Sequence, residues 1–329
     1  MGRLSEAVWC DLFLAQDPEA CLLREAPDSL ALRAVAPELR EDLLQLRDMV
    51  VSAVSGAGGT DFRVDWEGLR LRVERMDAVG GAVYVCRRLS AVVARLEDIG
   101  FPGALAARLL DPKIRDGLVL FMGRTGAGKT TVAASYIARV LAQRGGTCWT
   151  VENPVEMPLQ GPHGDGWCYQ TEVHDDSGFG PAIKRILRAS PNLILIGEIR
   201  DGGGAIDVMH AALSGHLVVA TLHANDIVTG LSRIARMSGD GGYLADALRA
   251  AIHLRLVVQD RESGRAAPTP PPGMVTTHPP RVLNVEPLLL TGPETDGVRS
   301  AIRNGEYHML KSEIERQRRS SMISWNTAK

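Results

Sequence analysis

The sequence predicts an α/β protein in two parts: a mainly parallel β-sheet covered by helices, preceded by a smaller α+β domain. From residue 117 onward, apolar strand-like runs alternate with helical patterns, which is typical of a parallel sheet with crossover helices. Before residue 98 the pattern is instead one amphipathic helix followed by strands of alternating polarity. The chain has 329 residues, 45% of them hydrophobic and 23% charged, which suits two globular domains.

The N-terminal domain is predicted to span residues 1–98. Its first part, 1–58, is assigned to helix because the apolar residues of ELREDLLQLRDMVVSAVSGAGG recur at spacings of three and four. The run FRVDWEGLRLRVERM alternates in polarity around Glu67-Gly68, as a β-hairpin does, and GGAVYVCRRL supplies another strand. Residues 99–116 contain glycine and proline and are predicted to be a linker with a short helix.

The second domain is predicted to span residues 117–329. Its first strands are expected in GLVLFMG, TCWTVE, NLILIGE and HLVVATLHA. The helices between and after them are expected at 129–143, 179–189, 204–213 and 226–238. Two more strands, LRLVVQ and RVLNVEPLLL, flank a Pro-rich stretch at 261–281. This stretch is predicted to be an exposed loop, with a proline-rich recognition motif as the alternative.

Charge and cysteine content exclude several classes of protein. The formal net charge of -2 offers no broad basic face, so direct nucleic-acid binding is not expected. The five cysteines form no C-x-x-C pair, which argues against a disulfide framework and a four-thiolate zinc site and predicts reduced thiols in the cytoplasm. Acids interrupt the N-terminal apolar stretch, which argues against a signal peptide, and no run approaches the roughly 18 apolar residues of a membrane span.

A glycine-rich stretch follows the first strand of the second domain. Its spacing, Gly123-x-x-x-x-Gly128-Lys129-Thr130, is that of a P-loop, and it stands between a strand and a helix as this motif requires. Backbone N–H groups at a helix N-terminus bind phosphate, the lysine neutralises the γ-phosphate, and the threonine hydroxyl binds Mg²⁺. The ligand is therefore expected to be a nucleoside triphosphate. The residues expected to bind it are Gly123, Thr125, Gly126, Ala127, Gly128, Lys129, Thr130 and Thr131.

Acidic side chains follow two of the predicted strands, at the end of the sheet where doubly wound folds bind ligands. In TVENPVE, Glu152 and Glu156 follow a strand, and Pro154 keeps a helix from starting between them. A carboxylate there can orient water for attack on a γ-phosphate, but both acids can equally be solvated loop residues. Glu198 follows the apolar strand of NLILIGEIRD and is expected to reach Mg²⁺ or its water.

Two histidines flank the strand of SGHLVVATLHAND. His216 and His223 are an odd number of residues apart, so they face opposite sides of a straight strand, which argues against a metal pair. His223 stands at the carboxyl end and is expected to be a donor near the γ-phosphate, whereas His216 is expected to be structural.

Taken in order, four stretches resemble the secretion ATPases of type II secretion, type IV secretion and type IV pili, also called traffic ATPases. They are GRTGAGKTT (Walker A), TVENPVE (Asp box), LILIGEIRD (Walker B) and GHLVVATLHAND (His box). The C-terminal AIRNGEYHMLKSEIERQRRSSMISW, and the lack of a four-cysteine zinc module, are similar to the pilus retraction motor and type IVB conjugation ATPase branch. The resemblance implies a RecA-like P-loop NTPase core preceded by a PAS-like N-terminal domain.

The resemblance also implies roles for the residues that match these motifs. It makes Glu156 the general base with Glu152 as its companion, Glu198 the Walker B carboxylate, and His223 the residue that senses the γ-phosphate. Thr130 and Glu198 are then the expected ligands of Mg²⁺. The arginines of RLRVER and CRRLS are expected near the nucleotide, with ordinary exposed strand positions as the alternative; they are Arg70, Arg72 and Arg87.

Several positions depart from the family's pattern and remove charge. Asn153 replaces an acid, Thr171 and Asp175 stand where arginine is common, and Ser190 and Asn192 stand where the family has aspartate. Because arginines that reach a phosphate accelerate its transfer strongly, these losses predict slow hydrolysis unless other cations compensate. The residues expected to compensate are Arg72, Arg87, Lys184, Arg188 and Arg200.

The leading interpretation is a hexameric ATPase motor, with ATP and Mg²⁺ as its cofactors, that powers a type IV pilus, conjugation or type IV/type II secretion machine. The resemblance implies a cytoplasmic homo-hexamer that is held by partners at an inner-membrane pilus or secretion platform and has no structural zinc. The alternative is a nucleotide-binding regulatory or assembly subunit with weak or no turnover. A DNA motor would share the fold but lacks support from the near-neutral charge.

Overall fold

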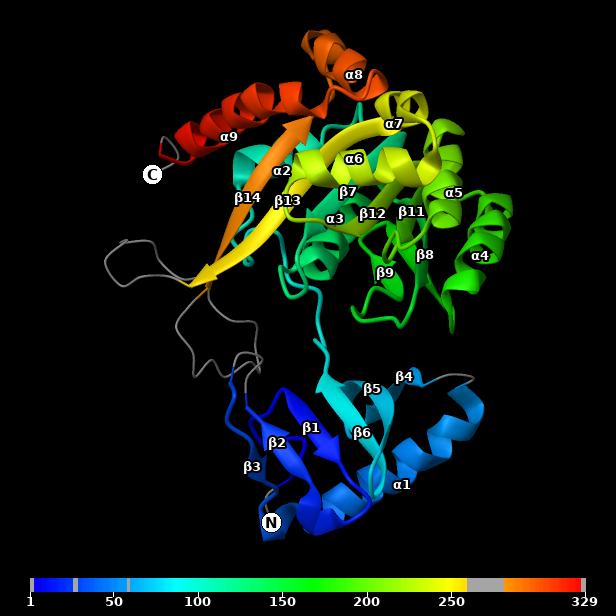
Figure 1. The fold of residues 1–329 in the computed structure, drawn as a ribbon, viewed down its shortest axis with the longest axis vertical. Helices are drawn as coiled ribbons and strands as arrows, with labels where there is room; N and C mark the ends of the chain where they lie inside the picture. The colour runs from blue at the N-terminus through cyan, green and yellow to red at the C-terminus, as the bar shows by residue number, and fades with distance from the viewer. Residues whose placement is uncertain (1–2, 26–28, 58–59, 259–280, 327–329) are drawn as a thin grey trace. The chain divides into compact units, whose positions relative to one another are not determined.

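The computed structural model describes residues 3–25, 29–57, 60–258 and 281–326. Within them the chain divides into two compact units (Figure 1). Of the described residues, the first unit comprises those up to Val92 together with Asn153–Pro158, and the second comprises Val93–Glu152 and those from Leu159 onward. The sequence predicts a boundary near residue 98, whereas the two units of the structure divide after Val92. The predicted Pro-rich loop at 261–281 lies outside the described residues except for Arg281.

The first unit is an antiparallel sheet packed against one long helix. Its sheet has the strand order β3-β2-β1-β6-β5-β4. The strands are β1 (Asp11–Leu14), β2 (Leu22–Arg24), β3 (Arg33–Ala34), β4 (Asp61–Trp66), β5 (Leu69–Ala78) and β6 (Gly81–Arg88). The helix α1 (Arg40–Ala57) buries Leu43, Leu46 and Val50 in a core shared with Leu12, Leu71, Val73 and other residues of the sheet.

The expectation of a helical segment over 1–58 is wrong in its first part. Strands β1, β2 and β3 precede α1, and among the described residues of this range only Arg40–Ala57 is α-helical. These strands are four, three and two residues long, which is too short for their polarity to alternate visibly. The predicted hairpin is confirmed: β4 and β5 pair antiparallel, and Glu67 and Gly68 take the positive φ angles of 49° and 78° that a two-residue turn requires.

The second unit has a mainly parallel sheet, as the sequence predicts, with eight strands among the described residues. The strand order is β14-β13-β7-β12-β11-β8-β10-β9, and only the outer pairs β14-β13 and β10-β9 are antiparallel. The strands are β7 (Gly117–Gly123), β8 (Gly146–Glu152), β9 (Gly161–His163), β10 (Gly166–Glu172), β11 (Leu193–Ile196), β12 (Leu217–His223), β13 (Leu248–Val258) and β14 (Arg281–Leu289).

Helices cover both faces of this sheet, as the predicted alternation of elements requires (Figure 1). They are α2 (Gly103–Leu109), α3 (Lys129–Arg144), α4 (Phe179–Ile186), α5 (Gly202–Leu213), α6 (Ile227–Ser238), α7 (Gly241–Ala247), α8 (Asp296–Arg303) and α9 (Leu310–Asn326). Every residue of β7 and β11 is buried, so these central strands read as continuous apolar runs. Helix α2, in the predicted linker, packs within this unit: the Tyr136 hydroxyl of α3 donates to the Leu109 carbonyl at 3.0 Å.

None of the helices in the described ranges is long and apolar enough to cross a membrane. All five cysteines lie in these ranges and are free thiols, four of them buried.

Candidate nucleotide-binding site

The P-loop joins the end of β7 to the start of α3. Gly126 and Gly128 have positive φ angles of 75° and 86°, which glycine adopts without strain. Gly123 has φ 156°, and a Cβ on it would lie 2.5 Å from the Leu254 carbonyl oxygen and 2.9 Å from the Ala127 Cβ. The glycines therefore permit a tight turn that positions backbone N–H groups at the beginning of α3, where the helix dipole favours an anion.

Lys129 and Thr130 occupy the first turn of α3. Lys129 is 9% exposed, and its Nζ donates to the Arg124 carbonyl at 3.2 Å, inside the P-loop. Gly128, the N-cap residue, offers no side-chain acceptor to the helix, so the first N–H groups of α3 can face a ligand. The cradle, the buried lysine and the threonine hydroxyl fit a triphosphate with its Mg²⁺.

His223 ends β12 directly beside the P-loop. The strand pairing places it opposite Gly123, and its Nε2 lies 2.9 Å from the Thr125 Oγ1. Burial lowers the pKa of His223, and the positive charge of Lys129 lowers it further, while Glu198 acts in the opposite direction. The imidazole is therefore neutral at pH 7 and can exchange a hydrogen bond with an oxygen of the site.

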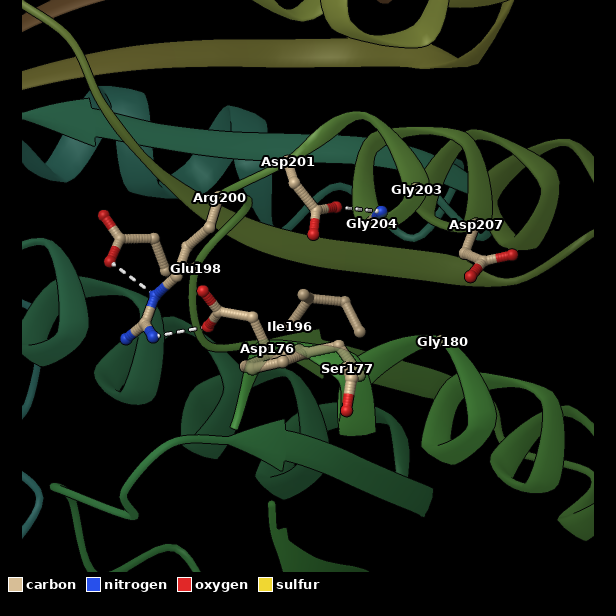
Figure 2. Close-up of a pocket in the computed structure, with 11 residues that line it drawn as sticks. Asp176, Ser177, Gly180, Ile196, Glu198, Arg200, Asp201, Gly203, Gly204 and Asp207 are labelled. Carbon is tan, nitrogen blue, oxygen red and sulfur yellow. Dashed lines mark hydrogen bonds and ion pairs between the residues drawn. The ribbon is translucent and has the colours of Figure 1, made fainter. Parts of the chain in front are cut away.

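Glu198 follows β11 at the same end of the sheet. Its Oε2 lies 3.5 Å from the Arg200 Nε, and Arg200 also donates to the Asp176 carboxylate at 2.7 Å (Figure 2). These three side chains lie along one side of a cavity of about 190 Å³, whose other side includes the N-terminus of α5 capped by Asp201. The Glu198 side chain is about one-quarter exposed and borders this cavity. A carboxylate in such a place is accessible to a hydrated metal ion.

Thr130 and Glu198 are the residues that could hold Mg²⁺. No cluster of three or more potential metal-binding His, Cys, Asp or Glu side chains occurs in the part of the chain that the structure describes. Magnesium usually takes one or two protein oxygens and completes its shell with water and substrate phosphate oxygens. The two residues therefore suit Mg²⁺ delivered with a nucleotide better than a metal held by the protein alone.

The two acids of TVENPVE fall in different units. Glu152 ends β8 in the second unit, is 2% exposed, and accepts a hydrogen bond from the Gln170 Nε2 at 2.8 Å. Glu156 lies in the segment Asn153–Pro158, which belongs to the first unit. There its Oε1 accepts a hydrogen bond from the Arg72 Nη1 at 2.8 Å.

The first unit places two of its three candidate arginines, Arg72 and Arg87, in one row across the sheet, whereas Arg70 lies opposite Asp65 on β4. Strand register puts Arg63 on β4 opposite Arg72 on β5, Arg72 opposite Arg87 on β6, and Arg87 opposite Asp11 on β1. Asp11 is completely buried, and its carboxylate pairs with Arg87 at 2.8 Å and with Arg24 at 3.0 Å. Arg72 and Arg87 are thus each paired with a carboxylate, although the Arg87 side chain is still 55% exposed.

The residues at which the family pattern loses charge have local structural contacts. Asp175 caps a short helical turn by accepting from the Gly178 N at 3.1 Å and the Ser177 Oγ at 2.5 Å, and these hydrogen bonds lower its pKa. The Asn192 Oδ1 accepts from the Thr147 N at 2.9 Å, which ties the loop before β11 to the start of β8. The Thr171 N donates to the Thr150 Oγ1 at 3.4 Å. Arg188, a candidate for compensation, is exposed in the turn after α4.

Two polar contacts of the site are not predicted from the sequence. The Arg124 Nε donates to the Asn225 Oδ1 at 3.2 Å, and the Arg233 Nη1 donates to the His223 carbonyl at 3.0 Å. The first links the P-loop to the residues just before α6, and the second links the end of β12 to the middle of α6. The only hint of the Arg124–Asn225 contact in the sequence is that Asn225 stands two residues after His223.

Comparison with known proteins agrees with this geometry. The family model described as "Type II/IV secretion system protein" matches residues 42–286. The chain belongs to this family. Type II secretion system protein HxcR of Pseudomonas aeruginosa is 38% identical over 205 residues, which are 61% of this chain and 42% of that protein. Type IV pilus assembly ATPase PilB of Thermus thermophilus is 33% identical over 192 residues, 57% of this chain and 21% of the relative.

A solved structure supports the fold. The pilus retraction motor PilT with bound ADP superposes with a TM-score of 0.72 at 23% identity, covering 96% of this chain and 90% of that one. The predicted resemblance to secretion ATPases and the predicted α/β fold are therefore confirmed. This chain spans less than half the length of the two curated relatives. The roles expected of the individual site residues stay predictions.

Proposed function

We propose that the protein is a Mg²⁺-dependent ATPase motor. The observation that carries this proposal is the P-loop cradle, in which Gly123 leaves no room for a side chain and Lys129 is buried against the loop. Family membership adds support, because the family includes a pilus assembly ATPase and a pilus retraction motor that binds ADP. The nucleotide is inferred to be ATP from that membership.

Each residue of the candidate site has a chemical task in this proposal. The N–H groups at the start of α3 and the Lys129 ammonium bind the phosphates and offset their charge. Mg²⁺, held by Thr130 and Glu198, would supply electrostatic stabilisation of the phosphate oxygens. His223, neutral at pH 7, hydrogen-bonds near the γ-phosphate, and Glu156 accepts the proton of the attacking water. Glu152 is buried and is assigned the companion role that the resemblance gives it.

The proposed machine is a type IV pilus, a conjugation apparatus or a type II or type IV secretion system. The names of the relatives support these settings, since they include a type II secretion protein and pilus assembly and retraction proteins. In this proposal the protein assembles as a homo-hexamer, is cytoplasmic, and reaches the inner membrane through partner proteins. Hydrolysis would then be coupled to movement of the two units.

A regulatory or assembly subunit that binds nucleotide with little turnover is the second candidate. It is favoured by the residues that stand where the family has charge. Asp175, where the family has arginine, caps a short helical turn and supplies no cation. Asn192, where the family has aspartate, hydrogen-bonds to Thr147 and supplies no acid. If no other arginine compensates, the chemical step would be slower by a factor of roughly 10³ or more.

Phosphate release by the purified protein with Mg²⁺-ATP separates the two candidates. We expect turnover in the wild type, and a loss of at least about 100-fold in Lys129→Ala and Glu198→Gln because each removes charge stabilisation of the reacting phosphates. Arg139→Ala is the matched control, since Arg139 is an exposed cation on the same helix as Lys129. Oligomeric mass is recorded in the same buffer.

The possible results lead to different conclusions. Turnover in a six-subunit species that both substitutions abolish would support the motor. Tight ATP binding without turnover in the wild type would support the regulatory subunit. Turnover that survives Lys129→Ala would contradict the proposed site.

A further inference from the structure

The Arg72 side chain links two carboxylates of the first unit. Its Nε donates to the Asp61 Oδ1 at 3.0 Å and its Nη2 to the Asp61 Oδ2 at 2.5 Å. Its Nη1 donates to the Glu156 Oε1 at 2.8 Å. Asp61, Arg72 and Glu156 are all 21–33% exposed in their side chains, so water screens these contacts only in part.

Asp61 determines how the Arg72 guanidinium is oriented. A bidentate pair between two guanidinium nitrogens and two carboxylate oxygens fixes the plane of both groups. Because Nε and Nη2 are used in this pair, Nη1 projects away from Asp61 and meets Glu156. Burial alone would lower the pKa of Arg72, but Asp61 and Glu156 outweigh it and the pKa is raised. The arginine is therefore a fixed cation with a directed donor.

Glu156 is held by one of its two carboxylate oxygens. Among the described residues, Oε1 bonds to Arg72, and no hydrogen bond or ion pair of Oε2 is found. An ionised carboxylate has lone pairs on both oxygens, so Oε2 keeps its capacity to accept a proton while Oε1 is anchored. The loop Asn153–Pro158 that carries Glu156 has no helix or strand of its own to orient this side chain.

We propose that Asp61 is a positioning residue for ATP hydrolysis, which acts on Glu156 through Arg72. This inference rests on the proposed function, in which Glu156 is the general base. Asp61 fixes the guanidinium, the guanidinium holds Oε1, and Oε2 takes a proton from water. The oxygen of that water forms a bond to the γ-phosphorus as the bond to the bridging oxygen breaks, and ADP leaves with the electron pair.

The first test is the steady-state kinetics of Asp61→Asn. We expect kcat to fall about 10- to 100-fold, because a misplaced catalytic group costs that much. We expect KM and the affinity for a fluorescent ATP analogue to stay within about twofold, since the triphosphate is bound by the P-loop. Asp61→Glu should recover part of the rate, because it restores a carboxylate. Asp65→Asn is the matched control: Asp65 is on the same strand, pairs with Arg63 and Arg70, and should leave kcat unchanged.

A double-mutant cycle distinguishes positioning from a general structural role. If Asp61 acts through Glu156, then Asp61→Asn should cause no further loss of kcat in a Glu156→Gln background, measured in single turnovers. A structural role would produce the same fold-loss in both backgrounds, and this result would overturn the inference. An unchanged kcat in Asp61→Asn would overturn it too.

Hydrogen exchange tests the same inference without turnover. In the nucleotide-free protein, Asp61→Asn should accelerate exchange in the peptide that contains Glu156, and Asp65→Asn should not. Exchange that is unchanged in Asp61→Asn would overturn the inference even if the wild type hydrolyses no ATP. The absence of hydrolysis in the wild type would by itself refute only the proposed function.

Discussion

Gly123 ends β7 at a point where a side chain would collide with two neighbours. Its added Cβ would lie 2.5 Å from the Leu254 carbonyl oxygen, so Gly123→Ala must shift the backbone of β13 or of the P-loop. We expect this variant to lose at least about tenfold in ATP affinity and about 1–3 kcal/mol of unfolding free energy. The measurements are titration with a fluorescent ATP analogue and urea unfolding.

The matched control is Gly215→Ala. Gly215 has φ 87°, and a Cβ there would meet nothing within 4 Å. It therefore carries the backbone strain of a left-handed glycine without the collision, and it lies outside the P-loop. Equal losses of ATP affinity in the two variants would contradict the steric explanation.

The lowered pKa of His223 predicts that the free energy of unfolding depends on pH. Its pKa is below the usual value of 6.5 in the folded chain because of burial and the Lys129 charge. A lowered pKa means that the unfolded chain binds a proton more readily. Stability is therefore unaffected by His223 above pH 6.5 and falls as the pH drops below it. His223→Gln should reduce this fall in urea unfolding, whereas His308→Gln, at an exposed position, should not; an NMR titration midpoint of His223 above 6.5 would contradict the prediction.

At the same scale, sequence reasoning located most candidate residues but not their contacts. The P-loop, Glu198 and His223 were predicted because each stands at the carboxyl end of an apolar strand, and that end is one edge of the sheet. The pairs Arg72–Glu156 and Arg124–Asn225 join residues 84 and 101 positions apart. No local pattern of residues encodes such a pairing, because it depends on the side-chain geometry of the folded chain.

Helix α9 packs along β14, an edge strand of the second sheet, and Gln317 makes the polar contact between them. Its Oε1 accepts from the Leu289 N at 2.7 Å and its Nε2 donates to the Leu289 carbonyl at 3.0 Å, both in buried surroundings. Gln317→Ala would leave two backbone groups without these partners, at a cost of about 1–3 kcal/mol each. We expect lower stability in urea and faster hydrogen exchange of the Leu289 amide.

Arg319→Ala is the comparison on the same helix. Arg319 is 78% exposed and pairs with Glu315 at 3.4 Å, a contact worth little in water. We expect a change within about 0.5 kcal/mol. An equally large loss in Arg319→Ala would mean that α9 is held by its charges and not by Gln317.

Helices and strands were predictable from the sequence where burial produces a long, uniform run of apolar residues. The central strands β7, β11 and β12 are continuous apolar runs because both faces of the sheet are covered, and α3 follows a helix-starting motif. Short strands were not predictable. Strands β1, β2 and β3 contain two to four residues, and their structure depends on pairing with other strands, such as Asp11 with Arg87.

Among the described residues, each of the two units has a hydrophobic core of its own. One core lies in the first unit around Leu12, Leu46 and Leu71, and another lies in the second unit beneath the P-loop. Lys129, Thr130 and His223 all belong to the second unit. Because chains with separate cores depart from two-state behaviour, we expect two unfolding transitions in denaturant without nucleotide.

Mg²⁺-ATP should shift the transition of the second unit. A ligand that binds only the folded state adds about 2.7 kcal/mol at a concentration of 100 times its Kd. Peptides from α3 and β12, followed by hydrogen exchange across a urea series, should report this shift, and Lys129→Ala should abolish it while both transitions remain. Because Lys129→Ala removes a phosphate contact and leaves both cores intact, equal stabilisation of this variant and the wild type by Mg²⁺-ATP would place the nucleotide somewhere other than the P-loop.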